Sequence, residues 1–258
     1  MICMIALSKQ KAFNTCSIFM KECVTFSLFK FDRTATKWWA FVQMGLGVKN
    51  LLKEVEGLKF CKLVGSGGGN GFSIYPNFAV YGLMCVWENE ENSEVFFEKN
   101  PFFQAYKIKT EEIWTVWLKT TMSHGIWDKA EPFAVSEKFD DTLPVAVLTR
   151  ATIKLRYLPY FWKFVPRTSR SVFDVEGRIF SIGIGELPII QQATFSLWQD
   201  AKKMMAFAYK SQFHSEVVQK TRALGWYSEE LFARFYPYKE SGTWDGKQIL
   251  KDNFGLGN

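Results

Sequence analysis

The sequence predicts an α+β protein made of two tandem ferredoxin-like (βαββαβ) repeats that together form a pseudo-dimeric α+β barrel. The first observation is internal similarity: the segment 86–110 aligns without a gap onto 197–221, so that Trp87 falls on Trp198 at an offset of 198 − 87 = 111 residues. The second is that strand-like and helix-like segments follow one another in the same order in both halves.

In the first half, a helical spacing of apolar residues predicts a helix over 36–55 and another over 93–111. Four further segments alternate in polarity or are continuously apolar, as strands are: 23–31, 58–65, 78–87 and 113–119. Asn100 followed by Pro101 predicts a helix N-terminus inside the second helical segment. The order of these elements is the βαββαβ arrangement.

In the second half, helices are expected over 158–173 and through His214. Strands are expected at 144–153, 178–185, 192–198 and 231–238. A four-stranded sheet of this kind leaves one face without helices. Two such faces in one chain can pack together, which predicts a barrel with an apolar interior.

These elements divide the chain into five parts. The predicted parts are an N-terminal extension (1–22), a first repeat (23–118), a linker (119–142), a second repeat that holds the proposed cofactor site (143–238) and a C-terminal tail (239–258).

The composition is that of a globular protein, with 48% hydrophobic and 22% charged residues and a high aromatic fraction of 17%. The net charge is +6 without a run of basic residues interleaved with aromatics, which argues against nucleic-acid binding. The five cysteines form no CxxC pair, which indicates a reducing compartment and no structural zinc. No stretch is long and apolar enough for a membrane span or fits a secretory signal, so a cytoplasmic location is expected.

His214 is one of only two histidines in the chain. In the repeat alignment it takes the place of Phe103, and "SQFH" puts it in the first turn of a helix capped by Ser211. The positive end of a helix keeps an imidazole neutral, which is the form that ligates a metal. From these residues alone, a core or surface histidine bonded to a carbonyl is the preferred interpretation. The other histidine, His124, lies in the polar linker and is expected to be solvated.

The remaining sequence signals indicate turns rather than catalysis. The "GSGGGNG" segment, 65–71, departs from phosphate-binding motifs and is expected to be a hairpin turn, as is "GIGELP", 183–188. Two distant histidines are too few for a zinc site. Haem, by contrast, needs a single protein histidine and a large apolar cavity, which the aromatic-rich barrel interior could supply.

Several segments resemble the spheroidene monooxygenase family of acyclic-carotenoid ketolases: "VLTRATIK", "FWKFVPRTSRS", "GELP", "QATFSLWQDAKKMMAFAY", "H..V...TR..GWYSEELFARF" and "KLVGSG.G.GF...PN.AVY". The resemblance extends from about Phe29 to Pro237. It implies a haem enzyme (haem b) of the dimeric α+β barrel superfamily, which also includes chlorite dismutases and aldoxime dehydratases.

The resemblance further implies oxygenation at C2 of an acyclic carotenoid end group, with O2 and electrons from a ferredoxin-type donor. Two hydroxylations at one carbon give a geminal diol, which loses water to become a ketone. His214 would be the axial ligand of the haem iron. Arg150, Arg167 and Arg170 are candidates for binding the haem propionates, with a surface salt bridge as the preferred alternative for each. No catalytic residue at the substrate is assigned.

Two other functions remain open from the sequence. One is a haem barrel that acts as a lyase or peroxidase on a small substrate, and the other is a haem- or lipid-binding protein without turnover. A carotenoid substrate also implies peripheral contact with the inner membrane face, for which the aromatic "YLPYFWKF" segment, 157–164, is a candidate.

Overall fold

The computed structural model of the protein describes residues 21–68, 73, 75–162, 175–187, 189–210 and 225–256. The strands are β1 (Cys23–Lys30), β2 (Leu58–Gly67), β3 (Pro76–Trp87), β4 (Glu112–Gly125), β5 (Val145–Ile153), β6 (Arg178–Gly185), β7 (Gln191–Trp198) and β8 (Tyr227–Gly242). The helices are α1 (Thr34–Glu54), α2 (Glu90–Lys99), α3 (Pro101–Lys109), a 3-10 turn η1 (Leu155–Tyr157), α5 (Ala201–Lys210) and α7 (Ile249–Phe254). No helix in these ranges is both long enough and apolar enough to cross a bilayer.

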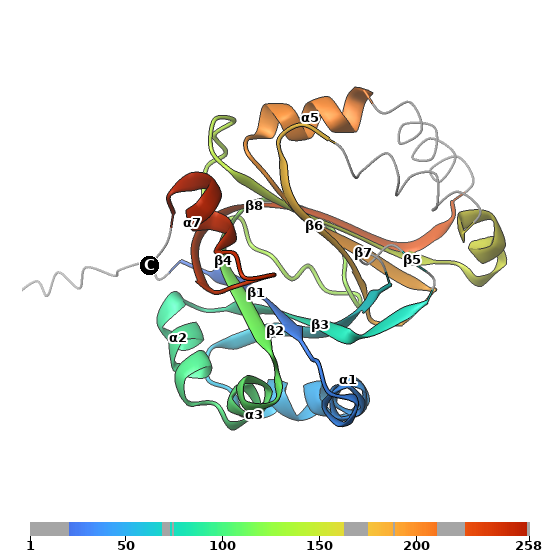
Figure 1. The fold of residues 1–258 in the computed structure, drawn as a ribbon. Helices are drawn as coiled ribbons and strands as arrows, with labels where there is room; N and C mark the ends of the chain where they lie inside the picture. The colour runs from blue at the N-terminus through green and yellow to red at the C-terminus, as the bar shows by residue number, and fades with distance from the viewer. Residues whose placement is uncertain are drawn as a thin grey trace, which may run out of the picture.

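The eight strands form one closed antiparallel barrel in the order β1-β3-β2-β6-β7-β5-β8-β4. If the four strands of each half are numbered along the chain, their spatial order in both halves is therefore fourth, first, third, second. Helices α1, α2 and α3 cover the outer side of the first sheet, and α5 lies on the outer side of the second (Figure 1). The predicted α+β barrel with two sheets face to face is confirmed.

The two halves are joined along two strand pairs, which we call seams, and the two seams differ in length. β4 pairs with β8 from Trp114 to Gly125, whereas among the described residues β2 and β6 pair only at Gly65–Gly185 and Ser66–Ile184. The hydroxyl of Ser66 adds a hydrogen bond to the Gly183 carbonyl, at 3.1 Å.

The interior of the barrel is packed with apolar side chains from both sheets. Phe26 of β1 and Phe195 of β7 meet across it with ring centroids 4.4 Å apart, and Phe133 contacts Phe235 at 5.1 Å. The sequence analysis expected a cofactor-sized apolar cavity here. In the described part of the interior, bulky rings and other apolar side chains occupy this space instead.

The two halves share their local backbone features. Trp87 and Trp198 are the last residues of β3 and β7, as predicted. Each pairs with the first residues of both neighbouring strands, and in each half the second strand, β2 or β6, has a bulge directly after that pair. The preceding turns, both "VEG", place Gly57 and Gly177 at φ values of 72° and 82°.

The fourth strand of each half ends in a Gly-x-Trp-Asp turn. Gly125 and Gly242 have φ values of 96° and 78°, and a Cβ there would come within 2.1 and 2.0 Å of a carbonyl oxygen of the facing strand, so only glycine fits. Glu229 of β8 accepts hydrogen bonds from the backbone of the first turn, and Glu112 of β4 accepts them from the second. Each half thus caps the turn of the other.

Several element boundaries differ from those expected, and three of the differences have a direct physical cause. The predicted helix over 93–111 is two helices, because Asn100 caps α3 by accepting from the Phe102 amide at 2.9 Å and Pro101 follows it. β4 continues to Gly125, into the predicted linker, since its last residues pair with β8. The predicted tail contains α7, whose first amides bond to the buried carboxylate of Glu240.

Candidate functional site

The predicted site residues fall into two groups. His214, Arg167 and Arg170 lie outside the described residues. Arg150 lies on β5 and His124 on β4. His124 is an exposed strand residue paired with Phe232, rather than the loop residue that was expected.

Arg150 is a buried cation at one end of the barrel, with only 1% of its side chain exposed. Its Nη1 lies 2.9 Å from Glu229, and its Nη2 lies 3.5 Å from Glu186 and 3.8 Å from Asp128. The guanidinium also lies over the ring of Trp127, at 5.3 Å. These contacts join β5, β8, the β6–β7 turn and the first Gly-x-Trp-Asp turn.

Lys62 of β2 extends the same network across the short seam. Its ammonium bonds to Asp128 and lies 3.0 Å from Glu186. Burial alone would lower the pKa of Lys62, but the hydrogen bonds to Asp128 and Glu186 raise it above its usual value, so Lys62 stays charged at neutral pH. The network therefore binds the first half to the second where the backbone pairing is shortest.

This geometry does not support Arg150 as a partner for haem propionates. The guanidinium faces the inner, packed side of the sheet with Ala146 and Leu148 of the same strand, and three carboxylates already surround it. We therefore do not retain Arg150 in the proposed cofactor site. Arg150 belongs instead to an ion-pair network, which the sequence does not predict because its members are far apart along the chain.

Replacing Arg150 by Met is expected to lower the free energy of unfolding by about 2–4 kcal/mol, because it leaves partly buried carboxylates without their cation. Urea denaturation measures the loss. Lys62→Met removes a more exposed cation and leaves Arg150 in place, so it should lower the free energy of unfolding by less. Haem content of folded Arg150→Met should equal that of wild type. A variant of normal stability that loses haem would restore the propionate role.

The outer faces of the two sheets, which lie under the helices, are built from different residues. In the first half, Leu63, Leu83 and Ser27 form one cross-strand row, and all three are buried. The row at the same register in the second half is Gly183, Thr194 and Thr149. Thr149 is exposed although it lies on a central strand.

The neighbouring rows show the same difference. Phe29 and Tyr81 in the first half correspond to Ala151 and Gln192 in the second. The buried pair Cys61 and Cys85 corresponds to Ser181 and Ser196, and the Ser181 hydroxyl is buried without a partner among the described residues. The first sheet thus presents a large apolar surface to its helices, and the second presents small or polar side chains.

Aromatic residues of α2 and α3 complete the packing of the first outer face. Phe103 contacts Phe29 at 6.1 Å, and Tyr106 contacts it at 4.7 Å. Over the second outer face, the buried cluster is confined to the end near Trp198, where Ala201 and Met204 of α5 pack. Within the described residues, the rest of this face has no comparable layer of rings.

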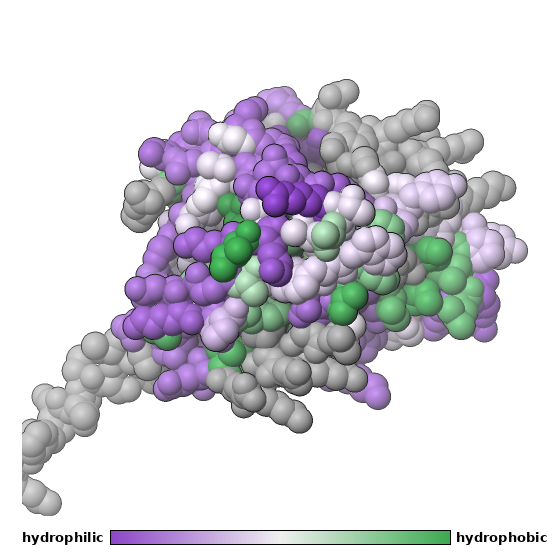
Figure 2. Space-filling model, turned by 60° about the horizontal axis from the view of Figure 1, so that its bottom comes forward, coloured by the Kyte–Doolittle hydropathy of each residue, from purple (hydrophilic) through white to green (hydrophobic). Residues whose placement is uncertain are grey.

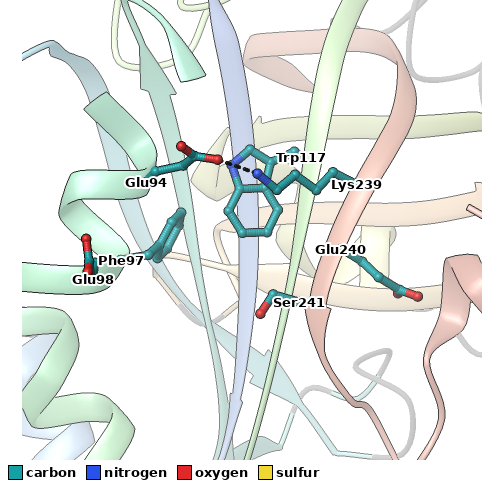
Figure 3. A pocket seen from close by; sticks show the side chains of 7 residues that line it. All are labelled: Glu94, Phe97, Glu98, Trp117, Lys239, Glu240 and Ser241. Carbon is teal, nitrogen blue, oxygen red and sulfur yellow. Dashed lines mark hydrogen bonds and ion pairs between the residues drawn. The ribbon is translucent and has the colours of Figure 1, made fainter. Parts of the chain in front are cut away.

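A shallow recess lies on the first half between α2, β4 and β8 (Figure 3). Lys239 crosses it to Glu94 and lies 5.1 Å from the centroid of the Trp117 ring. Phe97 packs against the other side of Trp117, at 5.2 Å. Its lining contains no histidine or cysteine and three carboxylates, which would repel haem propionates, so it is not a candidate for the cofactor.

Metal ligation and cysteine chemistry find no support in the described part of the chain. No three His, Cys, Asp or Glu side chains come together there as a metal site would require. Cys23, Cys61 and Cys85 are buried free thiols. Burial raises the pKa of Cys23 to about 11 and that of Cys85 well above its usual value, so both stay protonated and are poor nucleophiles.

Comparison with solved structures shows the same fold in aldoxime dehydratases. One, in complex with butyraldoxime, has a TM-score of 0.57 and 9% identity, and the match covers 85% of this chain and 80% of that one. A second aldoxime dehydratase has a TM-score of 0.54 and 9% identity, over 84% of this chain and 82% of that one. At this identity the likeness concerns the fold alone.

Comparison with known sequences is more specific, although no protein-family model matches. The spheroidene monooxygenase of Cereibacter sphaeroides is 37% identical over 230 residues, which are 88% of this chain and 70% of that protein. The spheroidene monooxygenase of Rhodobacter capsulatus is 37% identical over 227 residues, 87% of this chain and 93% of that one. That of Rubrivivax gelatinosus is 29% identical over 214 residues, 83% and 82% of the two chains. The chain therefore belongs to the spheroidene monooxygenase family and is an oxidoreductase of the monooxygenase class.

Proposed function

We propose that this protein is a haem-dependent monooxygenase that introduces oxygen at C2 of an acyclic carotenoid end group, first as a hydroxyl and then as a keto group. The carotenoid substrate is supported by the names of its relatives from three organisms. The oxidation needs O2 and an electron donor of the ferredoxin type.

The observation that carries the haem proposal is the difference between the two outer sheet faces. Where the first half has Leu63, Leu83 and Phe29, the second has Gly183, Thr194 and Ala151. Replacing three large apolar side chains by small ones removes volume between the sheet and whatever covers it. A flat cofactor such as haem fits against a face of this kind, since small side chains let it lie close to the backbone.

We further infer that the halves arose by tandem duplication, which relates the small residues to His214. The offset of 111 places His214 on Phe103. Phe103 contacts the ring of Phe29. In the second half, the position equivalent to Phe29 in the strand register is Ala151. The pair of rings in the first half thus corresponds to a histidine and an alanine in the second. That substitution would suit a histidine that holds the haem iron, with space in front of it.

In this proposal His214 would hold the haem iron, and Arg167 and Arg170 would bind the propionates. Bound haem would supply the site at which O2 is activated. The chain itself would exclude water and orient the C2 methylene of the substrate. Each hydroxylation consumes O2, two electrons and two protons and releases one water. The second gives a geminal diol, which loses water to form the ketone.

The test combines a spectrum with an isotope experiment on the purified full-length protein. We expect a Soret band, and we expect conversion of an acyclic carotenoid when reduced ferredoxin and O2 are supplied. With ¹⁸O2, the hydroxylated product should carry the label. A protein that takes up no haem would refute the cofactor. A haem protein whose product carries no oxygen from O2 would be a lyase or peroxidase, and one with no turnover a binding protein.

A further inference from the structure

An exposed aromatic cluster lies on the first half, between α1 and the start of β3. Trp38 is 61% exposed, Phe41 46% and Phe78 44%, and Val42 beside them is also exposed. The three rings contact one another, with centroids 5.8 Å apart for Trp38–Phe41, 6.3 Å for Trp38–Phe78 and 5.5 Å for Phe41–Phe78. We call these four residues the α1 cluster.

Helix α1 is apolar on both sides. Ala40 is buried, and Trp39 and Met44 pack toward the sheet and α3. The opposite side presents Trp38, Phe41 and Val42 to solvent. Large apolar side chains gathered on the solvent side of a surface helix are typical of interaction sites, so the exposed side of α1 indicates a binding surface.

The charges around the α1 cluster are predominantly positive. In helices α1 and α3, the charged side chains that the structure describes are all lysines: Lys37, Lys107 and Lys109. Neighbouring α2, by contrast, contains four glutamates and one lysine. Arg33, Lys37 and Lys107 form no ion pair with the residues described, so their charges are available to a partner. Figure 2 looks onto this helical side, where hydrophobic surface gathers toward the right and hydrophilic surface toward the left.

We propose that the α1 cluster with its lysine rim is the surface by which this protein docks on an anionic lipid bilayer. Aromatic rings on one helix face, flanked by lysines, are typical of helices that lie in the membrane interface. An excess of positive charge opposes pairing of two copies of this surface, whereas it attracts anionic headgroups. The biological reason for docking rests on the proposed function, because an acyclic carotenoid substrate dissolves in the bilayer.

Vesicle co-sedimentation of the full-length protein tests the proposal. Vesicles of equal parts phosphatidylcholine and phosphatidylglycerol should bind the wild type, and binding should weaken in high salt. Trp38→Ser/Phe41→Ser/Phe78→Ser should lower the partition coefficient by about ten-fold or more, because three ring contacts with the interface are lost. The cluster is exposed, so the variant should stay folded, which its unfolding midpoint checks.

The matched control removes three exposed apolar side chains elsewhere: Val95→Ser/Val135→Ser/Leu143→Ser. This variant should bind vesicles as the wild type does. If the α1 cluster variant binds vesicles as strongly as the wild type does, the proposal is overturned. So would a loss of vesicle binding only in Tyr160→Ser/Trp162→Ser, which would assign docking to the 157–164 segment. Tyr160 in that segment is also exposed.

Two other occupants are distinguished by the same variants. If the α1 cluster variant binds vesicles normally but is reduced more slowly by ferredoxin, the surface binds an acidic protein and the lipid proposal fails. If sedimentation velocity shows a dimer for wild type and a monomer for the variant, the occupant is a second copy. Vesicle binding requires neither haem nor turnover, so its failure would leave the proposed function untouched.

Discussion

Replacing His214 by Ala is expected to abolish most haem binding while leaving the fold in place. The iron–imidazole bond anchors the cofactor, so its loss should reduce the haem content of the purified protein by about ten-fold or more. The fold should persist because the corresponding position, Phe103, is filled by an apolar ring and does not require a polar group for packing. The measurement is the pyridine haemochrome content together with the Soret spectrum.

Added imidazole should partly restore the spectrum of His214→Ala, since it can occupy the space that the side chain leaves. His124→Ala is the matched control, because His124 is exposed on β4 and should affect neither haem content nor turnover. Unchanged haem content, spectrum and turnover in His214→Ala would remove the axial-ligand proposal.

Much of the fold follows from local sequence patterns. All eight strands lie where alternating or continuous apolar segments predict them, because one or both faces of each strand are buried. The cap at Asn100 was predicted from two residues. The extension of β4 to Gly125 was not predicted, since residues 120–125 are mostly polar and are held in the sheet by pairing with a distant strand, β8.

The candidate site was only partly predictable. Arg150 was chosen because it is a cation in a matched segment, but its partners Glu186 and Glu229 are brought to it by strand pairing that no local pattern contains. One small residue of the second outer face, Thr194, could have been found from the sequence. The same alignment that places His214 on Phe103 places Thr194 on Leu83. Only the strand register shows that these positions share one face.

Converting the second outer face to the residues of the first should block haem binding without unfolding the protein. The variant is Ala151→Phe/Gly183→Leu/Thr194→Leu, which introduces the side chains of Phe29, Leu63 and Leu83 at the same register. Gly183 lies in β6 with no positive φ, so its backbone accepts a side chain. If the small residues make room for a cofactor, the added groups occupy that room, and haem content should fall at least about ten-fold.

The stability of the haem-free variant decides between a cofactor space and a close-packed face. Large side chains placed in an already packed layer cost about 1–3 kcal/mol each, so three of them would unfold or strongly destabilise the protein. Placed in a space that haem fills, they should leave the unfolding free energy of the haem-free protein unchanged or raise it, because they bury apolar surface. The reciprocal control Leu83→Thr removes a fully buried side chain from the first half and should cost about 2–4 kcal/mol while haem content stays normal. A triple variant that is strongly destabilised, or that is stable and binds haem as the wild type does, would place the cofactor elsewhere in the protein.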